Sequence, residues 1–314
     1  MITLNFYLAM LKKTLYFASA YYLSTRLEQL IVQQKDSETK TERSFPIQDI
    51  GFLILDHPQL TLSHASAQKL IANNVAVVYC DEKHLPAAML LPFDAHQTQN
   101  ERFRQQLDVS EPSRKQLWKQ TIEMKITNQA AVLSAVKGTA GTMPRLIREV
   151  TSGDSTNREG VAARYYWSQL FTDYVPDFQR DRYGIYPNNL LNYGYAILRA
   201  ATARALVGAG LNITLGINHH NRYNAYCLAD DMMEPYRPFV DLQVAEIVAL
   251  EAPYFSENIS AAHKQKLLSI LAADTDFGEM KSPLMIALQR TATSLQKCFA
   301  GEIRKLNFPE IPIS

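Results

Sequence analysis

The sequence has few cysteines, no long hydrophobic run and almost no net charge. Its three cysteines, Cys80, Cys227 and Cys298, lie far apart and form no C-x-x-C pair. This spacing argues against a disulfide scaffold or a structural zinc site and favours a reducing compartment. No apolar stretch approaches the roughly 18 residues of a membrane-spanning helix. The net charge of +1 gives no sign of a partner of opposite charge.

The first residues do not have the order of a secretion signal. Met1–Leu11 is apolar, but no positive charge precedes it, and Lys12 and Lys13 follow it. A signal peptide places its positive charges before the apolar segment. We therefore expect a cytoplasmic protein that does not enter a membrane.

Lysine is absent between Thr139 and Asp241, where ten arginines and ten acidic residues balance each other. Arginine presents rigid, bidentate donors that suit phosphate or carboxylate. The equal numbers of arginines and acidic residues favour carboxylates as the partners, which would mean ion pairs within the protein. Phosphate binding stays open as the alternative.

The first 95 residues have the pattern of strands with one helix. Apolar runs predict strands at 14–22, 26–34, 50–55, 75–79 and 87–91, and Lys35–Arg43 predicts a polar turn. Ser63 is a candidate N-cap for a helix with apolar residues at helical spacing. From Phe93 onward the period becomes helical. Helices are expected at 113–137, 158–172, 187–208, 223–234, 239–250, 259–272 and 281–303.

This change of pattern predicts an α+β protein with two domains. We expect a small β-rich domain over residues 1–95 and a larger all-α domain over residues 96–314. The boundary falls within Leu91–Asn100, which carries Pro92 and several polar residues.

A first candidate for chemistry is Gly153–Trp167, in which a polar turn leads into a helix and Glu159 lies in the first turn. Thr156 and Glu159 match the spacing of a capping box, in which the glutamate serves only its own helix end. Gly160 favours the functional alternative. It is a poor helix former, and it would let another backbone or a ligand approach closely.

A second candidate begins with the loop Gly216–Asn221, which contains His219 and His220, and runs on to Pro238. Asp231 and Glu234 are three residues apart on a predicted helix and share one face. Neighbouring carboxylates repel each other unless a cation lies between them. If Glu159 meets His219 and Glu234, the mixed oxygen and nitrogen site suits Mg²⁺ or Mn²⁺ and phosphodiester chemistry.

The chain resembles the CRISPR-associated endonuclease-integrase family of spacer acquisition, in the branch found with type II systems. The resemblance covers nearly all of the chain from about Met10. Its motifs are Gly153–Trp167 (GDSTNREGVAARYYW), Gly216–His219 (GINH) and Leu228–Asp241 (LADDMMEPYRPFVD), with support from Leu91–Arg102 and Trp118–Gln129.

The resemblance implies the residues of the site. Glu159, His219 and Glu234 take the place of the family's catalytic metal ligands. Asp231 is a further candidate ligand, and His220 is the alternative to His219. Arginines beside the motifs are the candidates for phosphate contacts of bound DNA: Arg148, Arg158, Arg164 and Arg237.

The resemblance also implies a reaction and partners. The 3′-hydroxyl of a captured DNA fragment would attack a phosphodiester of the CRISPR array, with Mg²⁺ or Mn²⁺ bound. The implied partners are double-stranded DNA, a second copy of the chain and a dimer of the small second universal adaptation protein. The RNA-guided effector nuclease is a further candidate partner.

Two other functions stay open on the residues alone. A general metal-dependent nuclease acting on branched or single-stranded DNA would use the same three residues, with water as the nucleophile. A non-catalytic DNA-binding scaffold would use the acidic residues as caps and salt-bridge partners.

Overall fold

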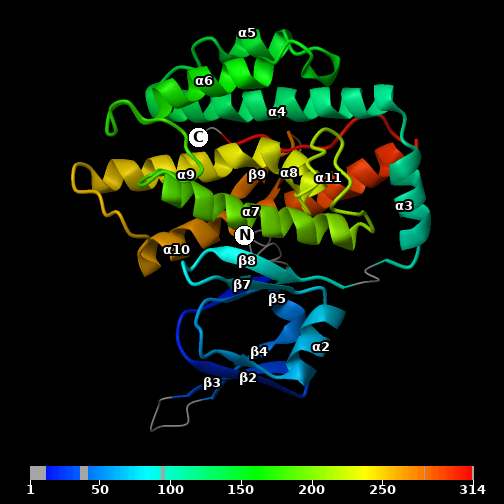
Figure 1. Ribbon diagram of the computed structural model, residues 1–314, viewed down its shortest axis with the longest axis vertical. Helices are drawn as coiled ribbons and strands as arrows, with labels where there is room; N and C mark the ends of the chain where they lie inside the picture. The colour runs from blue at the N-terminus through cyan, green and yellow to red at the C-terminus, as the bar shows by residue number, and fades with distance from the viewer. Residues whose placement is uncertain (1–11, 36–41, 93–95, 279, 313–314) are drawn as a thin grey trace. The chain divides into compact units, whose positions relative to one another are not determined.

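The computed structural model of the protein describes residues 12–35, 42–92, 96–278 and 280–312. The chain divides into two compact units, residues 1–95 and 96–314 (Figure 1). Within the described ranges, no helix has the length and apolar character needed to span a membrane. The Met1–Leu11 segment and most of the turn predicted at Lys35–Arg43 lie outside the described residues.

The first unit contains two four-stranded sheets and helix α2 (His64–Ala72). One sheet has the order β1-β5-β7-β8, with β1, β5 and β7 parallel and β8 antiparallel. The other has the order β4-β3-β2-β6. The strand bounds are β1 Lys13–Phe17, β2 Tyr21–Arg26, β3 Gln29–Gln34, β4 Glu42–Pro46, β5 Ile50–Leu55, β6 Thr61–Leu62, β7 Ala76–Cys80 and β8 Pro86–Leu90.

The core of this unit follows from its apolar runs. Every residue of β5 is buried, as expected of a strand inside a parallel sheet that is covered on both faces. Ser63 caps α2 as predicted, because its hydroxyl accepts a hydrogen bond from the backbone N–H of Ser66 at 3.2 Å.

Two predicted strand boundaries were wrong. The run Thr14–Tyr22 is not one strand, because the chain leaves one sheet after Phe17 and enters the other at Tyr21. The run Arg26–Gln34 contains a two-residue hairpin turn at Leu27 and Glu28, which both have positive φ, at 48° and 58°. Neither residue is Gly, Asn or Asp, so composition gave no signal for this turn.

The second unit is a layered bundle of helices. In Figure 1, α5 and α6 lie along one side of the long helix α4, and α7, α9 and α11 lie along its other side. The helix bounds are α3 Gln99–Asp108, α4 Glu111–Lys137, α5 Met143–Arg148, α6 Arg158–Leu170, α7 Asn188–Gly208, α8 Cys227–Met233, α9 Arg237–Glu251, α10 Ala261–Leu268 and α11 Leu284–Phe299. The 3₁₀ turns are η1 Ile47–Asp49 in the first unit and, in the second, η2 Ser152–Asp154, η3 Glu234–Tyr236 and η4 Ser269–Ala272.

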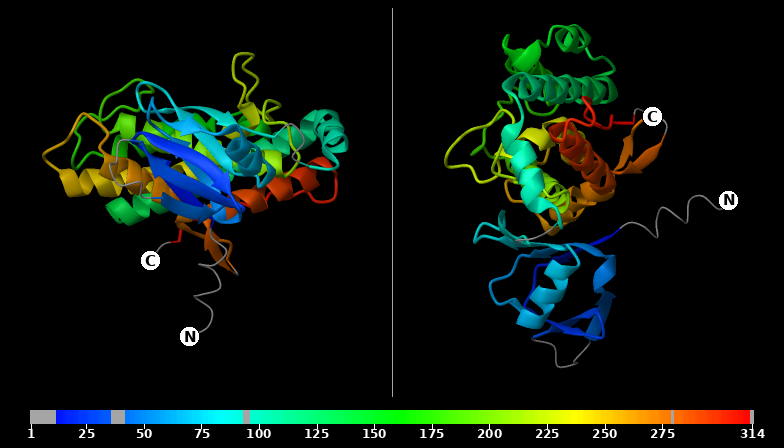
Figure 2. Two further views of the ribbon diagram at one scale, coloured as in Figure 1. Left: turned by 90° about the horizontal axis from the view of Figure 1, so that it is seen from below. Right: turned by 90° about the vertical axis from the view of Figure 1, so that its right-hand side faces the viewer.

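The α+β class is confirmed, with one correction in the second unit, which is not all-α. Strands β9 (Asp274–Asp276) and β10 (Lys281–Pro283) form an antiparallel pair beside α11 (Figure 2). The helix expected from residue 281 begins at Leu284. The chain is extended up to Pro283, whose missing N–H and fixed φ suit a position just before a helix.

Helix α4 organises the second unit. It runs for 27 residues, begins at the Ser110 cap and ends at Gly138, which has a φ of 74°. Its buried face carries polar as well as apolar side chains. Asn128 donates hydrogen bonds to the carbonyl oxygens of Pro235, at 2.8 Å, and Pro309, at 3.1 Å, and accepts one from the N–H of Ile311 at 3.0 Å. One amide thus ties η3 and the C-terminal segment to α4.

Replacing Asn128 by alanine is expected to lower the free energy of unfolding by at least about 2 kcal/mol, because three buried backbone groups lose their partner. Denaturant unfolding of the full chain measures the change. Asn189→Ala is the control, since its side chain donates to the Glu257 carbonyl at 2.8 Å and accepts from the N–H of the adjacent Leu190 at 2.8 Å, and neither bond involves α4. Equal losses in the two variants would contradict the role given to Asn128.

Candidate metal and catalytic site

The helix that carries Glu159 is capped by residues other than Glu159. The Asp154 carboxylate accepts hydrogen bonds from the N–H groups of Arg158, at 2.8 Å, and Glu159, at 2.9 Å. The Asn157 side chain accepts from the N–H of Gly160 at 3.1 Å. The capping box read from Thr156 and Glu159 does not form, so the Glu159 carboxylate is available to another part of the protein.

Gly160 has a local role that the sequence did not reveal. A Cβ at this position would lie 2.7 Å from the side-chain oxygen of Asn157. Glycine therefore makes room for the capping side chain, and the close approach that we predicted comes from within the same turn.

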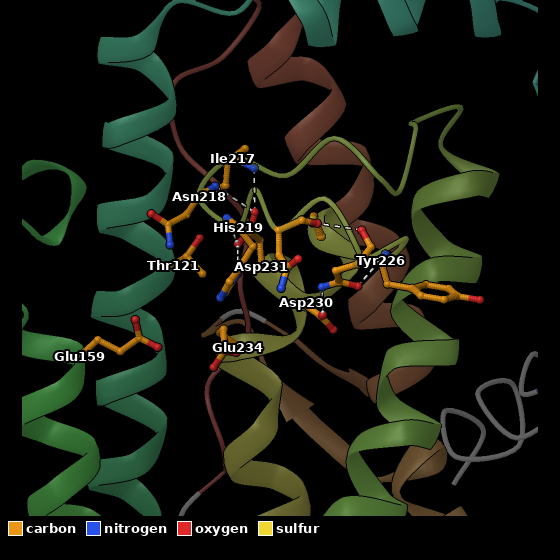
Figure 3. Close-up of polar contacts among 12 residues, drawn as sticks. Thr121, Glu159, Ile217, Asn218, His219, Tyr226, Asp230, Asp231 and Glu234 are labelled. Atoms are coloured by element: carbon orange, nitrogen blue, oxygen red, sulfur yellow. Dashed lines mark hydrogen bonds and ion pairs between the residues drawn. The ribbon is translucent and has the colours of Figure 1, made fainter. Parts of the chain in front are cut away.

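The loop that carries His219 is wrapped around the carboxylate of Asp231 (Figure 3). The backbone N–H groups of Ile217, Asn218 and His219 donate to this carboxylate at 2.7, 3.0 and 3.2 Å. Asp231 is fully buried. At Gly216 a Cβ would collide with the His219 carbonyl oxygen and lie 2.8 Å from Asp231 Oδ2, so only glycine fits this close loop.

The His219 ring is held by two contacts. Its Nδ1 lies 2.5 Å from Asp231 Oδ1, and it packs against the Trp118 ring in a T-shaped arrangement with a centroid distance of 5.7 Å. Within the described part of the chain its Nε2 makes no hydrogen bond. A carboxylate on one ring nitrogen and a free second nitrogen is the usual state of a metal-binding histidine.

Glu234 lies in η3 and is buried between two cations. Its Oε1 lies 2.8 Å from Arg237 Nε, and its Oε2 lies 2.6 Å from Lys125 Nζ. Burial by itself raises the pKa of Glu234, but Arg237 and Lys125 outweigh it and hold the pKa at about 2. Glu234 is therefore ionised throughout the physiological range.

Lys125 links Glu234 to Glu159. Its Nζ also lies 2.6 Å from Glu159 Oε1, so one ammonium bridges carboxylates from two distant segments. Figure 3 shows the Glu159 and Glu234 side chains turned toward each other. Burial lowers the pKa of Lys125, but the two glutamates outweigh this effect and raise it.

The sequence analysis assigned no role to Lys125. A signal was present, because Lys125 lies three residues after Ile122 and one before Ile126, on the apolar stripe of α4. A lysine on a buried helix face requires a charged partner.

The side chains of this site fit a divalent cation. Two carboxylates converge on one point that already holds a positive charge, and the His219 imidazole lies near enough to Glu234 for the charge of that glutamate to help raise the pKa of His219. Among the described residues, no three His, Cys, Asp or Glu side chains are close enough to hold a metal by themselves. The Lys125 ammonium lies between the carboxylates of Glu159 and Glu234, at 2.6 Å from one oxygen of each.

The remaining predicted site residues are Asp231 and four arginines, and they differ in their partners and exposure. Both carboxylate oxygens of Asp231 already accept hydrogen bonds. Arg237 pairs with Glu234, and Arg158 Nε lies 3.3 Å from Glu149 Oε2. Arg148 and Arg164 have exposed side chains.

A cleft lies beside His219 in this unit, with a volume of about 540 Å³. Arg114 and Arg222 line it together with Tyr223, whose ring lies 4.6 Å below the Arg222 guanidinium. Neither arginine was predicted as a site residue: Arg114 lies outside the motifs, and Arg222, although only three residues after His219, was not singled out among the arginines of that region. The cleft offers cationic and aromatic groups next to the cluster.

Comparison with known proteins agrees with this fold. The family model described as "CRISPR associated protein Cas1" matches residues 15–257. The CRISPR-associated endonuclease Cas1 of Neisseria meningitidis serogroup C (strain 8013) is 32% identical over 92% of this chain and 93% of its own.

Among solved structures, a casposase bound to its integration product superposes with a TM-score of 0.81 at 21% identity, over 97% of this chain and 95% of that one. A chain of a Cas6-RT-Cas1–Cas2 complex superposes with a TM-score of 0.72 at 22% identity, over 96% of this chain and 37% of that one.

The fold, a strand-rich unit followed by a helical one, is the fold of these solved structures. The chain belongs to the CRISPR associated protein Cas1 family. The narrower assignment to the branch found with type II systems stays a prediction.

The contact between His219 and Asp231 has a measurable consequence for titration. The hydrogen bond to Asp231, opposed by burial, raises the pKa of His219 above its usual 6.5. A raised folded-state pKa means that this contact stabilises the fold fully below the unfolded-state pKa. The stabilisation is lost as the pH rises through the folded-state pKa.

Asp231→Asn is therefore expected to lower the titration midpoint of His219, followed by NMR in metal-free buffer. Asp230→Asn is the matched control, because Asp230 pairs with Arg199 at 2.6 Å and acts on His219 only from a distance. An equal or larger decrease in the control would contradict the assignment.

Proposed function

We propose that this protein is a metal-dependent DNA integrase of CRISPR adaptation. It joins the 3′-hydroxyl of a captured DNA fragment to the CRISPR array by transesterification, and it also has endonuclease activity. The observation that carries the proposal is the convergence of Glu159 and Glu234 on one cationic point, with His219 in the same cluster. Membership of the Cas1 family and the names of its relatives support it.

Glu159, His219 and Glu234 would hold Mg²⁺ or Mn²⁺, and the imidazole suits Mn²⁺ better. A bound metal polarises a phosphodiester and lowers the pKa of an attacking hydroxyl. The remaining residues position these groups. Asp231 orients the His219 ring through Nδ1, and we assign it this role in place of direct ligation. Arg237 holds one oxygen of Glu234 and leaves the other to face the site.

DNA would be held by cationic side chains around this centre. The exposed Arg148 and Arg164 are available for phosphate contacts, whereas Arg237 is engaged with Glu234. In the cleft, Arg114 and Arg222 would bind phosphate and Tyr223 would stack on an unpaired base. Arg158 stays a candidate phosphate contact, because its distance to Glu149 is long for a hydrogen bond.

The proposed partners are double-stranded DNA, a second copy of the chain and a dimer of the small second adaptation protein. A solved relative is part of a complex named Cas6-RT-Cas1–Cas2, which supports the last of these. The first unit, residues 1–95, is the proposed dimerisation domain. The RNA-guided effector nuclease is a further proposed partner, and the cytoplasm is the proposed place of action.

The general nuclease differs from the integrase only in its nucleophile, so the products of the reaction separate the two. The scaffold hypothesis depended on Glu159 as a helix cap. Asp154 and Asn157 perform that function instead, so the partly buried ion pair of Glu159 with Lys125 does not serve to cap its own helix.

A strand-transfer assay tests the proposal. The full chain and its small partner are mixed with a labelled short duplex that has free 3′-hydroxyls and a supercoiled CRISPR-array plasmid. We expect label to join the plasmid at a repeat boundary with Mn²⁺ and not with EDTA. Glu159→Gln and His219→Ala should each lower the rate at least about 100-fold, since several kcal/mol of transition-state stabilisation are lost.

Glu149→Gln is the matched control and should retain activity, because Glu149 pairs with Arg145 and Arg158 outside the cluster. Nicking that depends on metal but joins no label would establish the nuclease instead. Activity that survives EDTA and both site variants would contradict the metal site.

A further inference from the structure

The point shared by Glu159 and Glu234 is occupied by part of the protein itself. Lys125 reaches it from the buried face of α4, and its Nζ lies 2.6 Å from one oxygen of each glutamate. The Lys125 side chain is only 11% exposed. Glu234 is buried and Glu159 is partly buried, and two such neighbouring carboxylates would repel each other without a cation between them.

An ammonium and a divalent cation cannot share this point. Mg²⁺ or Mn²⁺ requires oxygens at about 2.0–2.2 Å, and an ammonium in contact with the same two oxygens would overlap it. The two positive charges would also repel each other strongly, because the surroundings are buried. Either the ammonium or the metal can hold the two glutamates at one time.

We propose that Lys125 is an internal cation that holds Glu159 and Glu234 together before metal binds and that a divalent metal displaces it from between them. This inference rests on the proposed metal-dependent function. Lys125 is thus a positioning residue that weakens the apparent affinity for metal. It also keeps the glutamates from separating in the metal-free protein.

The inference accounts for the ion pairs that join the two glutamates and for the second cation beside Glu234. Glu159 lies on α6 and Glu234 on η3, and Lys125 on α4 joins them by side-chain ion pairs. Arg237 also stays bound to Glu234 Oε1, so displacement of the lysine leaves that glutamate with one cationic neighbour that keeps it ionised.

The experiment is a calorimetric titration of the metal-free full chain with Mn²⁺, together with thermal unfolding in EDTA and in Mn²⁺. Lys125→Met removes the charge and keeps the length of the side chain. If the ammonium occupies the site in about nine molecules of ten, the variant should bind Mn²⁺ about tenfold more tightly. Its midpoint of unfolding should fall in EDTA and recover in Mn²⁺.

Lys119→Met is the matched control. Lys119 lies on the same helix but is partly exposed and pairs with Glu123 at 3.5 Å, away from the cluster. It should leave both the Mn²⁺ affinity and the response of stability to metal unchanged. Lys125→Gln is measured as well, because its amide can still donate to a glutamate and supports folding if the methionine variant is too unstable.

The outcomes separate this inference from the proposed function. Tighter binding in the Lys125 variants that is lost on adding Glu159→Gln supports both. If Mn²⁺ binding depends on Glu159 but is not tightened by either Lys125 variant, the inference is wrong and the metal site stands. If no variant has Mn²⁺ binding that depends on Glu159, both are wrong.

Discussion

The repulsion between two neighbouring carboxylates, one buried and one partly buried, is the constraint on which the site depends. Glu159 and Glu234 come from segments that are 75 positions apart, and their negative charges repel each other unless a cation lies between them. Lys125 supplies that cation, and Arg237 adds a second positive charge beside Glu234. The ion pairs therefore require that α6 and η3 both lie against α4, and both elements pack on that helix.

Helix α4 carries the side chains that hold the segments of the site in place. Asn128 anchors the backbone of η3 at Pro235, one residue after Glu234, and Lys125 lies almost one helical turn earlier. Trp118 supports His219, whose loop is in turn shaped by the carboxylate of Asp231. Each candidate ligand is thus oriented by a second residue, which is how precise catalytic geometry is maintained in enzymes.

The sequence predicted the α+β class, most of the helices and the segments that carry Glu159, His219 and Glu234, because apolar periodicity and motifs report on local structure. It did not predict the hairpin turn at Leu27 and Glu28, whose positive φ comes from the twist of the paired strands. It also missed Lys125, because pairing across distant segments leaves no local pattern. The sequence also did not show that Asp154 caps α6, because this depends on backbone geometry that the spacing of residues in the sequence does not reveal.

The central claim is that Glu159, Glu234 and His219 share one divalent cation in place of the Lys125 ammonium. The most direct test is a crystal structure of the protein with Mn²⁺, in which anomalous scattering locates the metal. We predict one peak within about 2.0–2.3 Å of both glutamates and of His219 Nε2, with Lys125 moved away. A peak elsewhere, or Lys125 still between the glutamates at saturating Mn²⁺, would contradict the account.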